Sequence, residues 1–230
     1  AGFGSAFPID RELTTNLMAF KQLKVNAVAA QMSRGKLEKS TAMALSSIGS
    51  SLAKMSMDIC LYMGQDFDFI SFPSDLTTGS SIMPHKKNPD LFELVRGKCN
   101  TLQALPNQLA LLTTNLPSGY HRELQLAKGP MIDAVQELKA CLDILLFSLP
   151  QLRVTQNSTD QKKYDYLFSV DTLNAEVIAG KPFRDAYREI GEAIENGSYI
   201  PNRALNHTHL GSIGNLGLEV IRAKMKPLRE

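Results

Sequence analysis

Apolar side chains recur at spacings of three and four along four long stretches of the chain, a pattern that predicts amphipathic helices. The first stretch starts after Asp10, a residue type that caps helices, and its apolar face runs from Leu13 to Ala30 before Gly35. The second covers residues 37–64 and has the most regular stripe. That stripe is formed by Leu45, Ile48, Leu52, Met55, Ile59 and Tyr62.

Two further stretches complete the set of long helices. At residues 88–90 the sequence Asn-Pro-Asp predicts a helix start, with the asparagine as N-cap and the proline at the first helical position. The stripe then continues to Leu112, with a kink expected at Pro106. A fourth helix is expected over residues 131–149. Narrow stripes on such long helices indicate a bundle that also packs against helices of other subunits.

The pattern changes in the last third of the chain. Shorter helices are predicted over residues 160–179 and 182–196, with a last one near 216–226, and no stretch alternates as a strand would. We therefore expect an all-α fold with two domains. Residues 1–150 would form part of a long-helix bundle, and residues 151–230 a smaller helical domain.

Composition narrows the class of protein. The 230 residues include 25 basic and 23 acidic ones, giving a net charge of +2. This even balance argues against nucleic acid as the main partner. No apolar run reaches the roughly 20 residues that a membrane span needs, so no membrane partner is predicted. Three widely spaced cysteines fit reduced thiols in a cytoplasmic protein.

Two further features of the sequence need interpretation. His207 and His209 form a close histidine pair, for which we favour a polar surface loop over a metal site. The chain begins at Ala1, without an initiating methionine and without the charged and apolar segments of a signal peptide. We therefore expect it to be a fragment of a longer protein.

Residues 77–90 differ from the helices on either side. Their first half is rich in small hydroxyl residues, and their second half contains a proline, a histidine and two lysines. A serine becomes a useful base only where its deprotonated form is stabilised, as Lys86 and the N–H groups of a helix start can do. The same groups would stabilise the charge that develops when a proton is removed beside a carboxylate. An ordinary Gly/Ser turn leading into a helix fits these residues equally well.

Residues 79–89 read GSSIMPHKKNP, which resembles the signature GSSxMPxKxNP of the fumarase/aspartase superfamily of lyases at all eight of its fixed positions. The resemblance implies an all-helical homotetramer whose active sites are shared between subunits. It also implies β-elimination at a C–N or C–O bond of a small-molecule substrate, with fumarate released by most members. No metal and no organic cofactor are implied.

Three other segments resemble the argininosuccinate lyase family within that superfamily. Residues 116–128 resemble its LPxxYNxDLQxxK segment, residues 183–187 its PFRxAH region, and residues 8–13 its VDREL opening. The resemblance covers nearly the whole chain but only the C-terminal half of the family's length. It implies cleavage of argininosuccinate to arginine and fumarate in arginine biosynthesis, and it implies that this chain is inactive by itself.

The resemblance assigns catalytic roles to Ser80, Lys86 and Glu93, and substrate binding to Asn88. Ser80 corresponds to the serine that removes the proton beside the substrate carboxylate, and its neighbour Ser81 is expected to support the loop. Lys86 and Asn88 correspond to groups that bind and stabilise that carboxylate as its charge grows. Glu93 corresponds to a glutamate that pairs with a histidine in the other half of the family's length.

Substrate binding is assigned to a second segment. Tyr120, Gln125 and Lys128 correspond to substrate-binding positions, although a polar helix face is the plainer interpretation of the three. His85 and His121 depart from the family pattern, which usually has Gln and Asn there. His85 makes the signature more like that of adenylosuccinate lyase, an enzyme of purine biosynthesis. That enzyme and a non-enzymatic, crystallin-like relative remain the alternatives.

Overall fold

The computed structural model describes residues 3–228, which form two units, one ending at Gln156 and the other beginning at Asn157. The outermost residues of both predicted domains, 1–2 and 229–230, lie outside the described part. The helices of the first unit are α1 (Arg11–Leu17), α2 (Ala27–Met32), α3 (Lys36–Tyr62), α4 (Asp90–Leu102), α5 (Leu105–Leu112) and α6 (Lys128–Ser148). Those of the second unit are α7 (Ser169–Ile178), α8 (Phe183–Glu195) and α9 (Leu218–Met225).

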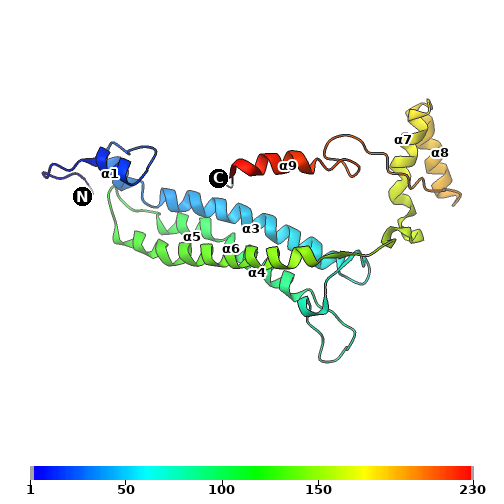
Figure 1. Ribbon diagram of the computed structural model, residues 1–230, viewed down its shortest axis with the longest axis horizontal. Coiled ribbons are helices and arrows are strands. Elements are labelled where there is room, and N and C mark those ends of the chain that lie inside the picture. Colours follow the sequence, from blue (N-terminus) through cyan, green and yellow to red (C-terminus); the bar gives the residue numbers. More distant parts are fainter. Residues whose placement is uncertain (1–2, 229–230) are drawn as a thin grey trace. The chain divides into compact units, whose positions relative to one another are not determined.

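Four helices of the first unit, α3, α4, α5 and α6, pack side by side as a bundle (Figure 1). One part of its core lies around Phe92, whose ring centroid is 4.7 Å from that of Phe72. Another part surrounds Leu109 and Leu138. The predicted all-helical bundle is therefore confirmed. The pair of two-residue strands β1 (Ile70–Ser71) and β2 (Arg153–Val154), which no sequence pattern indicated, runs antiparallel beside it.

Small side chains set the contact between α3 and α4. The buried positions of α3 are Ala42, Gly49, Ala53, Ser56 and Ile59. A Cβ atom at Gly49 would lie 3.0 Å from the Leu102 Cδ2 atom and 3.2 Å from the Cys99 carbonyl oxygen. The helix over residues 37–64 is thus confirmed, but its predicted apolar stripe is only partly buried. Ile48 is 44% exposed, because the close approach of α4 requires small residues rather than large ones.

The first predicted helical face is broken into two short helices. Asp10 caps α1 as expected, accepting a hydrogen bond from the Leu13 N–H at 2.8 Å. The helix then stops at Leu17, and Ala19 has a left-handed φ of 55°. The Arg11 guanidinium donates to the carbonyl oxygens of Lys24 and Val25, at 2.6 and 2.7 Å, and holds the intervening loop. The expectation of one continuous face from Leu13 to Ala30 is therefore wrong.

Two later breaks in the chain fall where they were predicted, whereas the helix expected over residues 160–179 begins only at Ser169, after 3-10 turns. Pro106 lies in the first turn of α5, so that α4 and α5 are separate helices. In the second unit, α7 packs against α8, with residues 179–182 between them. Arg203 joins several segments of the second unit. Its guanidinium donates to the Thr159 carbonyl oxygen at 2.8 Å and to the Asp165 carboxylate, and it lies 4.8 Å from the centroid of the Phe168 ring.

Candidate functional site

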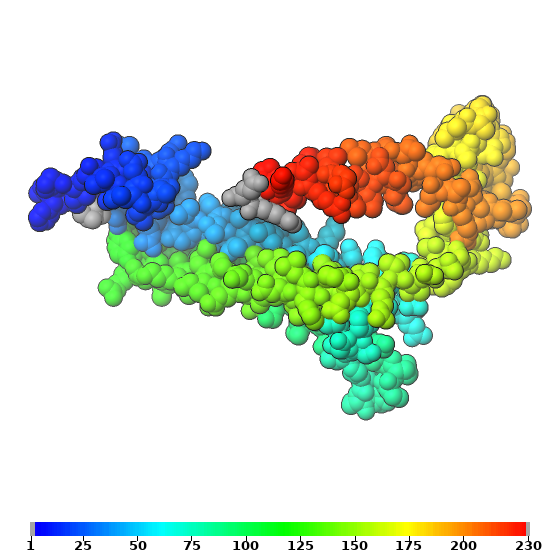
Figure 2. Space-filling view, viewed as in Figure 1, coloured from blue at the N-terminus to red at the C-terminus, as the bar shows by residue number. Residues whose placement is uncertain are grey.

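The signature loop, residues 77–90, leaves the end of the bundle and returns to it through a closed base. Thr78 and Asn88 form an antiparallel bridge in which the Asn88 N–H donates to the Thr78 carbonyl oxygen at 2.8 Å, and the Thr78 N–H to that of Asn88 at 3.3 Å. Figure 2 shows the loop, in blue-green, projecting from the packed helices. The residues between the bridge partners are exposed except for the half-buried Ser80, and the bridge holds the loop at its base.

The Asn88 side chain closes the loop instead of capping α4. Its Nδ2 group donates to the carbonyl oxygens of Thr78 and Gly79, at 3.3 and 3.1 Å. The N-cap position belongs to Pro89, and α4 begins at Asp90, whose Oδ1 atom accepts the Thr78 N–H at 3.2 Å. The predicted N-cap at Asn88 is wrong because an extended backbone partner, Thr78, is available to its amide.

Ser80 has the most distinctive polar environment in the loop. Its Oγ atom accepts hydrogen bonds from the N–H groups of Ile82 and Met83, at 3.2 and 3.1 Å. Two N–H donors aimed at one oxygen favour negative charge on it. The Ser81 hydroxyl is exposed and makes no hydrogen bond to any residue in the described part of the chain. The local geometry therefore distinguishes the two neighbouring serines.

Lys86 lies in the same loop as Ser80, and Glu93 lies further along the chain, in α4. The Lys86 side chain is exposed, and the backbone N–H of Lys86 donates to the Met83 carbonyl oxygen at 3.1 Å. Glu93 is exposed on the first turns of α4, facing the end of α3. Burial raises the pKa of the Cys60 thiol on α3, the positive charge of Arg96 opposes this rise, and the Glu93 carboxylate adds to it. Glu93 is therefore close to α3 and open to a group from outside this unit.

The predicted substrate-binding residues form a second group. The Gln125 side-chain amide donates to the Tyr120 hydroxyl, and the Arg34 guanidinium lies 5.9 Å from the centroid of the Tyr120 ring. Lys128 and Arg34 line a cleft of about 320 Å³ at the start of α3. The Arg34 Nε–H donates to Glu38 at 3.1 Å. The sequence did not point to Arg34, because a single basic residue beside Gly35 does not indicate a binding site.

The two groups lie at opposite ends of the bundle. Lys128 shares its cleft with Glu38 in the first turn of α3, whereas Glu93 influences Cys60 in the last turn. At 1.5 Å per residue, the helix between these positions is roughly 30 Å long. One copy of this unit therefore brings Ser80, Lys86, Asn88 and Glu93 to one end, and Tyr120, Gln125 and Lys128 to the other.

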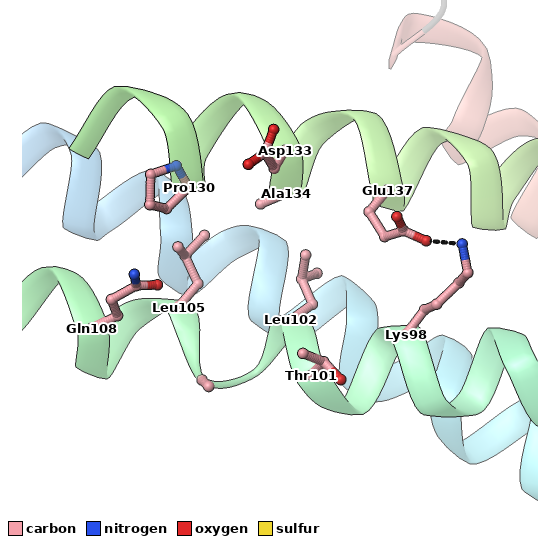
Figure 3. Close-up of a pocket in the computed structure, with 10 residues that line it drawn as sticks. Lys98, Thr101, Leu102, Leu105, Gln108, Pro130, Asp133, Ala134 and Glu137 are labelled. Carbon is pink, nitrogen blue, oxygen red and sulfur yellow. Dashed lines mark ion pairs between the residues drawn. The ribbon is translucent and has the colours of Figure 1, made fainter. Parts of the chain in front are cut away.

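A larger cleft lies between the two groups but contains none of these residues. It has a volume of about 460 Å³ where α4 and α5 meet, opposite α6. Figure 3 shows Lys98 and Glu137 facing each other across it as an ion pair, with Leu102 and Leu105 along the apolar lining. Apolar and polar residues share the lining, and of its three charged side chains Lys98 and Glu137 pair with each other, while Asp133 also lines the cleft.

The described residues offer neither a metal site nor a helix that could span a membrane. Within residues 3–228, no group of three or more histidine, cysteine, aspartate or glutamate side chains is placed to hold a metal ion. His207 instead pairs with Asp171, the Nε2 atom lying 2.7 Å from Oδ1, and its ring stacks near that of His209. Among the described helices, none combines the length and the apolar character needed to cross a membrane.

Comparison with known proteins identifies the class. Residues 1–103 match a lyase family. Over 98% of its length the chain is 50% identical to an argininosuccinate lyase of Parabacteroides distasonis, of which it covers 51%. It is also 34% identical, over its whole length, to an argininosuccinate lyase of Xylella fastidiosa, of which it covers 52%. The crystal structure of an EDDS lyase in complex with formate superposes with a TM-score of 0.65 at 20% identity, covering 86% of this chain and 40% of that one.

The chain is similar to this lyase family over residues 1–103 and to argininosuccinate lyases over nearly its whole length, and it has the helical fold of the solved EDDS lyase. The two relatives from Parabacteroides distasonis and Xylella fastidiosa are argininosuccinate lyases, the family that the sequence resemblance predicted. The chain spans about half the length of the curated relatives it matches.

Proposed function

We propose that the protein cleaves argininosuccinate to arginine and fumarate by β-elimination, as part of arginine biosynthesis. The observation that carries the proposal is the pair of N–H groups that hold the Ser80 oxygen, in a loop that also presents Lys86. The 50% identity to an argininosuccinate lyase supports the choice of substrate.

In the proposed reaction Ser80, as its alkoxide, takes the proton from the carbon beside a substrate carboxylate. The electron pair of that C–H bond passes onto the carboxylate, where the Lys86 ammonium stabilises the added charge. The pair then returns to form the C=C bond of fumarate as the C–N bond breaks, and an acid protonates the leaving nitrogen. We propose that Glu93 orients the imidazole that serves this last step.

Asn88 was expected to bind the substrate carboxylate, but in this loop conformation its side chain holds the loop together. Its amide hydrogens are both engaged by the carbonyl oxygens of Thr78 and Gly79 in this loop conformation. A carboxylate needs donors, so the amide binds substrate only if these contacts open. We propose that Asn88 first fixes the loop and then contributes an N–H to the carboxylate when the loop closes over substrate.

The separation of the two residue groups supports a site shared between subunits. Tyr120, Gln125 and Lys128 cannot meet Ser80 of the same copy across roughly 30 Å of helix. Large apolar side chains are also exposed along α3 and α6, including Met43, Leu146 and Phe147. We propose a homotetramer in which these faces are buried and each active site combines residues of several subunits, and we place the protein in the cytoplasm, where its free thiols would stay reduced.

The test is a turnover assay on the protein as its gene encodes it, including any sequence beyond these 230 residues. We expect release of fumarate from argininosuccinate, followed by ultraviolet absorbance, and much slower release from adenylosuccinate. A faster reaction with adenylosuccinate would move the assignment to that alternative. No turnover of either substrate by a correctly assembled oligomer would refute the proposed activity.

A further inference from the structure

The side chain of Tyr120 is held at both of its ends. The Gln125 side-chain amide donates to its hydroxyl oxygen, and the guanidinium carbon of Arg34 lies over its ring, 5.9 Å from the centroid. A cation within about 6 Å of an aromatic centroid is attracted to the face of the ring. Because the hydroxyl oxygen already accepts a hydrogen bond, its own proton remains to be donated to another group. Tyr120 is 40% exposed, so that group can come from outside the unit.

Arg34 is fixed in turn by the first turn of α3. Its Nε–H donates to the Glu38 Oε1 atom at 3.1 Å, and the Gly35 N–H donates to Oε2 of the same carboxylate at 2.8 Å. Glu38 is the third residue of the helix, so one side chain both caps α3 and holds the guanidinium. Partial burial raises the pKa of Glu38, but hydrogen bonds from its own N–H, from Arg34 and from Gly35 hold that pKa below its usual value.

Gly35 packs the start of α3 against the segment that contains Tyr120. It is buried, it has a left-handed φ of 83°, and a Cβ atom there would lie 2.6 Å from the Thr113 Cγ2 atom and 3.5 Å from the Leu124 Cδ2 atom. Both the conformation and the first of these contacts require a glycine. Thr113 and Leu124 are the two ends of the segment 113–124. Tight packing of the backbone therefore sets where Arg34 meets Tyr120.

We propose that Arg34 and Glu38 are positioning residues for substrate binding, which fix the ring of Tyr120 so that its hydroxyl can donate to the substrate. The inference rests on the proposed function, since it takes Tyr120 as a substrate-binding residue. Glu38 orients the guanidinium, the guanidinium orients the ring, and Gln125 orients the hydroxyl. A binding group that is held before the ligand arrives loses less side-chain freedom on binding. Proton removal stays with Ser80, at the other end of the bundle.

Loss of the guanidinium should weaken substrate binding without slowing the chemical step. Arg34→Gln should raise the KM for argininosuccinate by about two- to five-fold, the size expected of an exposed cation–π contact, and leave kcat within about two-fold. Glu38→Gln should raise KM by about two-fold, because its amide oxygen can still cap α3 but no longer pairs with a charge. The control is Arg222→Gln, which removes an arginine that pairs with Glu219 in the second unit and should leave KM unchanged.

A double variant separates positioning from direct contact with the substrate. Tyr120→Leu should raise KM by itself, and adding Arg34→Gln to it should raise KM no further, because Arg34 acts through the ring of Tyr120. Additive effects of the two substitutions would overturn the proposal, because Arg34 would then act on the substrate independently of Tyr120. An unchanged KM in Arg34→Gln would overturn it as well.

Hydrogen exchange separates these results from failure of the proposed function. In the protein as its gene encodes it, without ligand, the backbone amides of residues 113–124 should exchange faster in Arg34→Gln than in the wild type, as mass spectrometry of peptic peptides would show. Faster exchange together with no turnover of argininosuccinate by the wild type would refute the activity and leave Arg34 as the residue that fixes Tyr120. Exchange at the wild-type rate would overturn the proposal whether or not the wild-type protein is active.

Discussion

Gly49 provides the sharpest test of how α3 and α4 pack. Gly49→Ala adds one methyl group, whose carbon would lie 3.0 Å from the Leu102 Cδ2 atom and 3.2 Å from the Cys99 carbonyl oxygen. Optimal carbon–carbon contacts are about 3.5–4.0 Å, so the contact with Leu102 is too short, and the contact with the Cys99 oxygen is also tighter than most Cβ contacts in proteins. The Leu102 side chain can move aside, whereas the Cys99 oxygen belongs to the backbone of α4 and can move only with its helix.

Two effects of opposite sign decide the outcome at Gly49. Alanine is about 1 kcal/mol more favourable than glycine inside a helix. Overpacking a close contact costs about 1–3 kcal/mol. We expect the cost to prevail, with Gly49→Ala lowering the free energy of unfolding by about 1 kcal/mol. Gly49→Val, which adds two further methyl groups against the same backbone, should lower it by about 3 kcal/mol.

Gly97 is the matched control for this substitution. It lies in α4 with no atom within 4 Å of the position its Cβ would take. Gly97→Ala should therefore gain about 0.5–1 kcal/mol from helix propensity alone. The assay is urea unfolding followed by circular dichroism, comparing midpoints at constant m. If Gly49→Ala stabilises the protein as much as Gly97→Ala does, α3 and α4 do not approach each other closely at Gly49.

Two further predictions concern other parts of the molecule. Arg203→Lys should lower the stability of the second unit toward thermal unfolding by about 1–2 kcal/mol, because lysine lacks the planar fork that binds Thr159 and Asp165 together. The control, Arg222→Lys, should change this stability little. Equal effects of the two substitutions would contradict this role of Arg203. Burial, with Cys141 beside it, raises the pKa of the Cys99 thiol to about 12. The protonated thiol therefore contributes fully to the stability of the fold below pH 9, and this contribution is lost as the pH rises toward 12. Iodoacetamide at pH 8 should accordingly modify the half-buried Cys60 first and Cys99 only on unfolding, as mass spectrometry of the alkylated peptides would show.

The helices were predictable from the sequence where apolar periodicity is long and uninterrupted. The long helix α3 and the break at Pro106 follow directly from residue spacing and backbone chemistry. The buried side of α3 was harder to predict, because periodicity favours large residues such as Ile48. The contact with α4 instead uses the small residues Gly49 and Ala53. Which helix comes close is a property of the tertiary structure that one helix's sequence does not encode.

The candidate site shows a similar division. The signature identified the loop, and the residue types indicated an anion site beside a serine. The N–H groups that distinguish Ser80 from Ser81 depend on the turn at Met83, which spacing does not reveal. The extended pairing of Asn88 with Thr78 also overrode its local preference for capping a helix. The separation of Ser80 from Lys128 depends on the packing of both segments along α3, which the sequence pattern does not show.

The most direct test of the account is to compare Ser80→Ala with Ser81→Ala, in the protein as its gene encodes it. Both variants should keep the helical circular dichroism and the oligomeric state of the wild-type protein, because both residues lie in a loop outside the core. We predict that Ser80→Ala lowers kcat for argininosuccinate by at least about 100-fold, the contribution expected of a general base, whereas Ser81→Ala retains most of it. Unchanged turnover in Ser80→Ala, or the larger loss in Ser81→Ala, would contradict the assignment of Ser80 as the base.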